Sequence, residues 1–550
     1  MQATTARPLP LFRSTKHAVV ASVLGMAAVA IVSATPKSPF RPELPSGMQP
    51  FFPMRWIGDT IGLERLGTLG MMIVGLIATS FAAVGFLLVL REAWNGRLTM
   101  RTVAILSAAY LAVVLMLPLL FSRDVYSYAY YGRIVSTYGG NPYVLTPADF
   151  SLNSMWKLTW PGWRATPSVY GPLFTWISVF MTRLLRSPTS VISGYQALAA
   201  AAAAGTIVIV GRLLTRVRPD RAVFGVALIG LNPIVVFHVV GGGHNDMLVA
   251  FFVAAAVALL FARRELLSAL ALGLGMSVKA TAVIPLLLLI VAVVANAPPE
   301  RRKRLLLTYS GVVGAVWLAL ALPFLQTQNP TLGILEVSGH DSWMAPGQLV
   351  VRLFSGIGGL IGGDPFRGPF QMAARLGLFG MSAVGVVMIA RRVWKEPSAR
   401  TPLALTAAWG WALLIVILPS PVLFTWYLMW ILPLAWALPR VARRSVVILS
   451  AFFIVTQLVT ESSRLPDVLR SVKLPFGHPI AIAVCVWVGI DFVRRIRHGI
   501  PLEGETGRPE FGDRFESGPV DLEEDLPVSA EPVPARTGAW APFAALRLIR

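Results

Sequence analysis

The sequence predicts an all-α membrane protein whose chain crosses the bilayer many times, and three observations lead to this prediction. Hydrophobic residues make up 55% of the 550 residues and charged residues only 14%, against roughly 25% charged residues in an ordinary globular protein. Apolar runs that start near Thr68, Thr102 and Leu305 approach or exceed the ~18 residues that span a bilayer. Basic residues gather in the short connections between such runs. A soluble fold could not bury so much apolar surface.

The apolar runs divide into about fourteen predicted spans. These spans are residues 17–35, 68–90, 102–121, 189–211, 222–240, 246–262, 266–278, 280–296, 305–324, 371–390, 403–419, 422–438, 444–460 and 479–493. Counting the apolar stretch 171–185 as a further crossing would move every later arginine cluster to the other side. We therefore expect it to be a short helix that dips into the membrane or lies at its surface. If it did cross, a single bent element in place of the two spans around Lys279 would return the later arginine clusters to their original side.

The net charge of +21 reports topology, because the basic residues cluster in seven short connections. These connections are residues 91–101, 212–221, 263–264, 301–304, 391–400, 440–444 and 494–497. Such a distribution is the positive-inside pattern. It predicts a multi-pass plasma-membrane protein with both termini in the cytoplasm. Nucleic acid is not an expected partner, because the basic groups flank spans and no basic stripe interleaved with aromatic residues occurs.

The two ends of the chain differ in composition from the rest. The first predicted span follows Arg7, Arg13 and Lys16, so a signal peptide is an alternative to a first transmembrane helix. Ten of the 27 acidic residues lie in residues 501–550, where Pro and Gly replace apolar periodicity, and we expect this tail to be disordered. The single cysteine, Cys485, excludes an intramolecular disulfide.

This topology divides the chain into five parts. They are a cytoplasmic N-terminus (1–16), two N-terminal transmembrane helices (17–101), a core (102–330) with a large outer loop (122–188), C-terminal helices (331–495) with outer loops at 325–370 and 461–478, and an acidic tail (496–550). Cytoplasmic connections are short, whereas the outer ones are long or polar. The working surface is therefore expected on the outer face.

The most informative outer segment is SRDVYSYAYYGRI, residues 122–134. Asp124 stands at the membrane boundary, where proximity to lipid raises the pKa of a carboxyl, and we expect the neighbouring Arg123 to limit that shift. Such a carboxylate can take a proton from a hydroxyl. The alternative is that both residues cap a span and the tyrosines form an interfacial belt.

Two further segments, GGNPY (139–143) and PSVYGPLF (167–174), enclose a tryptophan-rich stretch. Aromatic residues with Gly and Pro suit stacking on sugar faces, and they also suit helices at the headgroup level.

GGGHND, residues 241–246, joins two spans. Glycines let backbone amides approach an anion, and His244, Asn245 and Asp246 can bind a phosphate or a polyhydroxyl group. His244 and Asp246 are also conceivable metal ligands, but two ligands in one turn do not predict a metal site. A tight turn capped by Asn and Asp is the alternative.

Lys279 interrupts an apolar stretch from Leu266 to Ala295. A lysine at the bilayer centre costs about 3 kcal/mol on insertion scales. We therefore expect it to point into a cavity and neutralise a phosphate. The alternative is that it extends outward to the membrane interface, at a break between two short helices. His340 and Asp341 in SGHDSW add polar groups to a later outer loop.

RDVYSYAYYGR, GGNPY, PSVYGPL and GGGHND occur in this order from about residue 100 to 300. Together they resemble the GT-C superfamily of membrane glycosyltransferases. More narrowly, they resemble the actinobacterial polyprenol-phosphomannose-dependent α-1,6-mannosyltransferases of lipomannan and lipoarabinomannan synthesis. The resemblance implies a GT-C-like bundle and inverting transfer of mannose from polyprenyl-phosphate-mannose to a mannan or a phosphatidylinositol-mannoside-type acceptor. It also implies an active site on the extracytoplasmic face, with Asp124 as the general base.

We assign contacts with the donor phosphate or sugar by charge and sidedness. The residues are Arg123, Tyr170, His244, Asn245, Asp246, Lys279, His340 and Asp341. A lipid monophosphate is already a reasonable leaving group, so no cofactor or metal is expected to be required, although some relatives use a metal. Superfamily members often carry the acid after the first span, whereas here it follows the third. Another polyprenyl-phosphate sugar, arabinose or a different hexose, and a lipid-linked sugar transporter or flippase are the alternatives.

Overall fold

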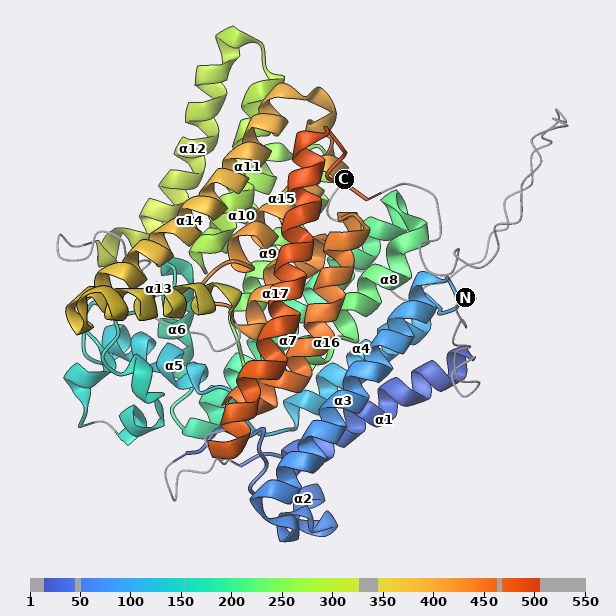
Figure 1. Cartoon of the computed structure of the whole chain (residues 1–550), viewed down its shortest axis with the longest axis vertical. Helices are drawn as coiled ribbons and strands as arrows, with labels where there is room; N and C mark the ends of the chain where they lie inside the picture. The colour runs from blue at the N-terminus through green and yellow to red at the C-terminus, as the bar shows by residue number, and fades with distance from the viewer. Residues whose placement is uncertain (1–13, 45–50, 153, 326–344, 462–466, 505–550) are drawn as a thin grey trace, which may run out of the picture. The chain divides into compact units, whose positions relative to one another are not determined.

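The fold is that of a computed structural model, shown in Figure 1. It describes residues 14–44, 51–152, 154–325, 345–461 and 467–504. His340 and Asp341, together with the tail from residue 505, lie outside the described residues. Within the described ranges every regular element is a helix and no strand occurs. The prediction of an all-α polytopic membrane protein is confirmed.

The long helices begin and end close to the predicted spans. They are α1 (Thr15–Ala34), α3 (Gly67–Trp94), α4 (Met100–Leu115), α7 (Pro188–Val217), α8 (Pro219–Gly230), α9 (Asp246–Phe261), α10 (Glu265–Met276), α11 (Val283–Asn296), α12 (Pro299–Ala321), α14 (Asp364–Lys395), α15 (Pro402–Ile417), α16 (Arg440–Glu461) and α17 (Asp467–Arg497). Four further α-helices lie outside the predicted spans: α2 (Arg55–Ile61), α5 (Asp124–Ser136), α6 (Pro172–Leu184) and α13 (Pro346–Gly362). Among the described residues, five helices are long and apolar enough to cross a membrane unaided, or six when the bent pair of α8 and the next helix counts as one span.

Several basic connections meet at one end of the bundle, here called the basic end. Arg221 and Arg443 lie over the Trp94 ring, with guanidinium carbons 3.6 and 4.3 Å from its centroid. Arg302 lies over Trp394 at 5.2 Å, and Arg392 donates to the carbonyl of Arg495. Six of the seven predicted basic connections are thereby linked. The opposite end, which holds Asp124, His244 and Lys279, is called the site end.

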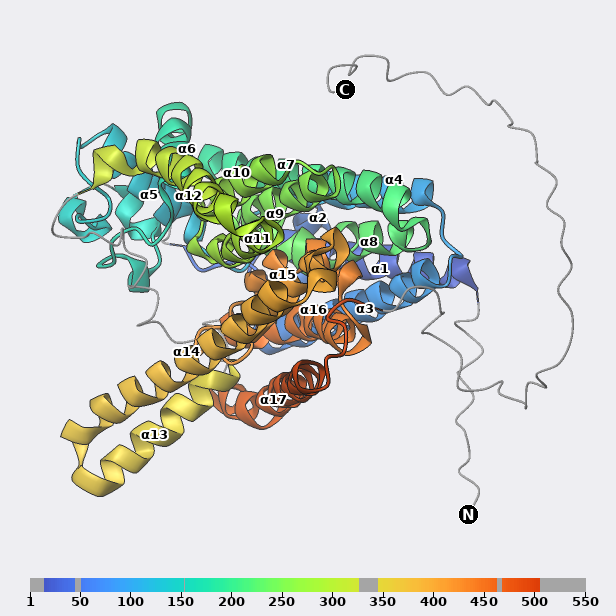
Figure 2. The same ribbon diagram turned by 90° about the horizontal axis from the view of Figure 1, so that it is seen from above.

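Fourteen segments of the described chain run alternately between the two ends. They are α1, α3, α4, α7, α8 with its continuation, α9, α10, α11, α12, α14, α15, residues 425–437, α16 and α17. α6 is not among them. It lies beside α5, with the Ser136 and Thr182 hydroxyls 3.1 Å apart, and its start is held at the site end by Gly171, which donates to Val278. α15 packs between α9 and α14, and α16 packs between α3 and α17, as Figure 2 shows.

Three predicted elements differ in form from the expectation. Residues 422–438 form two short 3₁₀ helices, Thr425–Trp430 and Leu432–Ala437, and Pro433 lacks the backbone donor that would continue an α-helix across their junction. The span 222–240 bends by 40° after α8 and continues as a π-helix, Ile234–Val240. The expected outer loop 461–478 is helical from Asp467 onward as the start of α17.

Candidate active site

Asp124 is the first residue of α5, and the turn before it is fixed by backbone hydrogen bonds. Phe121 adopts a positive φ of 62°, and its N–H donates to the Phe40 carbonyl at 2.7 Å. The Asp124 N–H donates to Ser122 Oγ at 3.1 Å. A carboxylate at a helix N-terminus also interacts favourably with the helix dipole. The acid therefore sits in a defined position and not on a mobile loop tip.

Gln196 of α7 ties this turn to the GGGHND segment. Its Nε2 donates to the carbonyls of Gly241 at 2.8 Å and Pro118 at 3.3 Å. The Leu120 N–H adds a bond of 3.1 Å to the Gly241 carbonyl. Two motifs that lie far apart in the sequence are thus held side by side by one buried amide, which the sequence did not single out.

The environment of Asp124 suits a general base. Its side chain is buried, and burial raises the pKa of its carboxyl to about 6. Hydrogen bonds from Ser122 and Trp163 and the charge of Lys279 oppose that rise, whereas the charge of Asp246 adds to it. Arg123, expected to limit the shift, instead interacts with Glu43 and Arg164. The cation whose charge opposes the rise is Lys279, which comes from a distant part of the chain and is paired with Asp246.

His244 is the closest ionisable neighbour of the acid. Its Nδ1 lies 3.6 Å from Asp124 Oδ2 and 3.5 Å from the Tyr128 hydroxyl, and its ring stacks on Trp426 at 4.0 Å between centroids. Burial and the charge of Lys279 lower the pKa of His244 well below its usual value. The imidazole is therefore neutral at physiological pH and acts by dipole and hydrogen bonding.

Asp246 and Lys279 form a buried ion pair beside Asp124. Lys279 Nζ donates to Asp246 Oδ1 at 2.8 Å, and Trp430 Nε1 donates to the same oxygen at 2.8 Å. The ammonium lies 4.9 Å from the centroid of Tyr427, a cation–π distance. Lys279 therefore points into the site and does not reach toward the interface. It breaks the apolar stretch between α10 and α11, which is where two short helices were predicted.

Four buried polar atoms of the GGGHND segment have no hydrogen-bond partner among the described residues. They are His244 Nε2, Asn245 Oδ1, Asn245 Nδ2 and Asp246 Oδ2. Buried polar atoms are nearly always paired in folded proteins. Their concentration in three consecutive residues next to Asp124 is what a site for a hydroxyl-rich or anionic ligand requires.

The aromatic motifs form one wall of the same site. Tyr128 meets Tyr170 edge to face at 4.9 Å, and the Tyr143 hydroxyl of the GGNPY motif donates to the Tyr170 carbonyl at 2.8 Å. Gly171 donates its N–H to Val278, next to Lys279. A Cβ at Gly171 would stand inside contact distance of the Ser277 carbonyl, so glycine permits this close approach.

The structure thus gathers six of the predicted residues at one place: Asp124, Tyr170, His244, Asn245, Asp246 and Lys279. Arg123 is half-buried beside Glu43 and Arg164. Trp430 and Gln196 are site residues that the sequence did not reveal, because each reaches the site from a separate segment, whereas Trp163 belongs to the tryptophan-rich stretch between GGNPY and PSVYGPLF. No three His, Cys, Asp or Glu side chains come together within the described ranges in a way that could hold a metal ion.

A many-helix membrane bundle with a buried carboxylate, a paired cation and an aromatic wall at one end is the arrangement of a polytopic membrane enzyme. The family described as "Alpha-(1->6)-mannopyranosyltransferase, N-terminal domain" matches residues 19–296. The chain belongs to this family of glycosyltransferases, and the resemblance drawn from the motifs is confirmed.

Two relatives extend the match. α-(1→6)-Mannopyranosyltransferase A of Mycobacterium tuberculosis is 26% identical over 407 residues, which cover 72% of this chain and 75% of the relative. Its namesake in Corynebacterium glutamicum is 29% identical over 181 residues, 31% of this chain and 36% of the relative. No solved structure gives a significant match.

Proposed function

We propose that the protein transfers mannose from polyprenyl-phosphate-mannose to a hydroxyl of a growing α-1,6-mannan of a cell-envelope lipoglycan. The relatives' names support mannosyl transfer with α-(1→6) linkage. The observation that carries the proposal is Asp124, a buried carboxylate with a pKa of about 6, set 3.6 Å from the neutral His244. About nine-tenths of such a group is ionised at pH 7.

The reaction is a single displacement with inversion. The Asp124 carboxylate takes the proton of the acceptor hydroxyl while the acceptor oxygen bonds to C1 of mannose. The bond from C1 to the phosphate oxygen breaks, its electron pair leaves with the polyprenyl phosphate, and a β-linked donor gives an α-linked product. General-base catalysis of this kind contributes about 10²- to 10⁴-fold.

Lys279 is the cation placed to stabilise the charge of the leaving phosphate. Asp246 and Trp430 fix its position in the resting protein. Asn245 and the free oxygen of Asp246 offer hydrogen bonds to the donor, and His244 orients Asp124. None of these roles needs a metal, so incubation with EDTA should leave the rate unchanged.

The decisive experiment is the Asp124→Asn variant in membranes supplied with polyprenyl-phosphate-[¹⁴C]mannose and a short α-1,6-mannoside. We expect turnover to fall 10²- to 10⁴-fold, while donor binding persists because Asn keeps the shape of the side chain. Asp149→Asn is the matched control, since Asp149 caps a turn of the same loop and should not affect turnover. Normal turnover by Asp124→Asn would show that Asp124 is not the general base.

The same assay separates the alternatives. Product formed from an arabinosyl or another hexosyl donor, but not from the mannosyl donor, would reassign the sugar. Movement of intact lipid-linked sugar across vesicles, unimpaired in Asp124→Asn, would indicate a transporter.

We also propose that the site end faces the outside of the cell, because the basic end carries the arginines that usually stay in the cytoplasm. Replacing the single cysteine by Cys485→Ser gives a background for labelling. Leu152→Cys in the exposed loop after α5 should react with a membrane-impermeant maleimide on intact cells. Arg264→Cys, between α9 and α10, should react only after permeabilisation. The reverse pattern would overturn the orientation.

A further inference from the structure

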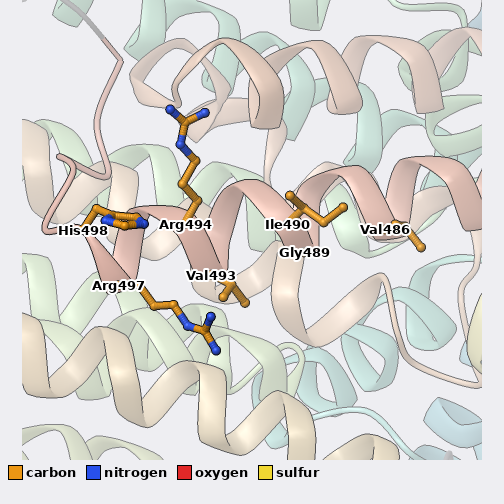
Figure 3. A pocket seen from close by; sticks show the side chains of 7 residues that line it. All are labelled: Val486, Gly489, Ile490, Val493, Arg494, Arg497 and His498. Atoms are coloured by element: carbon orange, nitrogen blue, oxygen red, sulfur yellow. The ribbon is translucent and has the colours of Figure 1, made fainter.

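A groove lies along the last turns of α17, away from the Asp124 site. It has a volume of about 510 Å³ and is lined by Val486, Gly489, Ile490, Val493, Arg494, Arg497 and His498. Figure 3 shows these side chains along one stretch of the helix, with the apolar ones preceding the two arginines and the histidine. The proposed transfer reaction makes no use of this groove.

The lining residues follow the period of one helical face. Val486, Ile490 and Val493 are spaced four and three residues apart, which stacks them on one side of the helix. Ile490 is 64% exposed, so this side faces out of the protein. The face is apolar for two turns and cationic in the last turn. A phospholipid has the same order of chemistry, with an acyl chain followed by a charged headgroup at the membrane surface.

Three arginines occur in the last turn, and their partners differ. Arg495 donates to Asp491 at 2.9 Å and to the Pro501 carbonyl. Arg494 and Arg497 are exposed, and no ion pair joins either of them to another described residue. Two cations of the groove are thus left for an external anion.

The helix end that carries these cations is firmly held. Arg392 donates to the carbonyls of Gly499 and Ile500, and Trp411 Nε1 donates to the Leu502 carbonyl at 2.9 Å. The backbone carbonyl of Arg494 accepts a hydrogen bond from the His498 N–H at 3.0 Å. Arg494 and Arg497 are therefore not needed to cap the helix.

A second groove at the basic end provides a comparison. It also has a volume of about 510 Å³, and it is lined by Glu300, Lys303, Arg304, Leu307 and Thr308. It too has two cations, but it contains a carboxylate and a single large apolar side chain. An anion would meet repulsion from Glu300, and an acyl chain would find little apolar surface to cover.

We propose that the α17 groove binds one anionic phospholipid. The side chains of Arg494 and Arg497, which extend to opposite sides of the helix in Figure 3, close on its phosphate from either side. His498 adds a hydrogen bond, and an acyl chain lies over Gly489 against Val486, Ile490 and Val493. Basic pockets beside transmembrane helices on the cytoplasmic side bind anionic headgroups in this way.

The charge test uses the purified full-length protein from membranes that contain phosphatidylglycerol, with retained lipid measured by native mass spectrometry. Arg494→Gln/Arg497→Gln should lower the fraction of protein that carries an anionic phospholipid about tenfold. Lys303→Gln/Arg304→Gln is the matched control and should not change it. Equal losses of bound lipid in both variants would mean that lipid binding depends only on general surface charge, which would overturn the proposal. Unchanged lipid binding by Arg494→Gln/Arg497→Gln would also overturn it.

The steric test leaves the charge unchanged. A Cβ at Gly489 meets no heavy atom within 4 Å, so Gly489→Leu should fold normally and fill the groove. We expect it to displace the lipid as the double variant does. Gly380→Leu on α14, where a Cβ also meets nothing within 4 Å, is the control. Lipid retained by Gly489→Leu would contradict an acyl chain at this place.

Two other occupants give different results. Displacement of the lipid by millimolar inorganic phosphate would mean a plain anion site. A chain truncated after Gly504 that gains lipid would identify the acidic tail as the resting occupant. Either result would overturn the proposal.

Discussion

The two ends of the bundle differ in how far their charged side chains are buried. At the site end the buried carboxylates of Asp124 and Asp246 lie beside the partly buried Lys279. At the basic end many arginines are exposed, and those that are buried, such as Arg221 and Arg443, lie over the Trp94 ring. Buried charges of opposite sign depend strongly on one another, because removing one leaves the other buried without a counter-charge. Charges at an exposed end can be removed singly at little cost.

The largest effect should come from removing the cation at the site end. Lys279→Met leaves Asp246, which is fully buried, without its ion-pair partner. Breaking a buried pair in this way costs about 3–5 kcal/mol. We expect the free energy of unfolding, measured by SDS titration in mixed micelles, to fall by that amount at pH 7.

The double variant Lys279→Met/Asp246→Asn is the control for this prediction. It removes both charges and keeps an acceptor for Trp430 Nε1, so it should recover most of the lost stability. A double variant as unstable as Lys279→Met alone would show that the ion pair is not the cause.

Gly171→Ala tests the close approach that joins the aromatic wall to the Lys279 segment. The new Cβ would press on the Ser277 carbonyl, and overpacking of this kind costs about 1–3 kcal/mol. We expect lower thermal stability together with a raised KM for the donor, because Tyr170 and Lys279 move apart. Gly314→Ala on α12, where a Cβ meets nothing within 4 Å, should leave both quantities unchanged.

The pH profile sharpens the comparison at the level of one atom. Asp124 acts as a base only when ionised, and its pKa is about 6, so kcat/KM should fall about tenfold per pH unit below 6 and be level above 7. The charge of Lys279 lowers that pKa. Lys279→Gln should therefore move the acid limb to higher pH, and Arg440→Gln at the basic end should leave it in place. Movement to lower pH would contradict the assignment.

The sequence was sufficient to predict the helices, but it was insufficient to predict which side chains contact one another in the site. Apolar length and arginine position predicted the helices closely, including the short helix at residues 172–184, since both signals are local. Asp124 could be chosen because it stands at the membrane boundary, just after the third predicted span. Lys279 could be chosen because it interrupts an apolar stretch, but its pairing with Asp246 and their contact with Trp430 could not be predicted, because these arise only through tertiary packing. The 3₁₀ form of residues 425–437 was also missed, although Pro433 was a usable signal for a break in the middle of that span.

The smallest effect is expected at the basic end, where Arg221 and Arg443 lie over Trp94. A cation–π contact contributes about 0.5–2 kcal/mol. Removing Arg221 leaves Arg443 at the ring and relieves the repulsion between two like charges, so Arg221→Gln should cost at most about 1 kcal/mol. Arg443→Gln and the double variant complete a cycle in which the second removal should cost more than the first. If Arg221→Gln destabilised the protein as much as Lys279→Met, the basic end would also be an interdependent buried cluster and the contrast between the two ends would be lost.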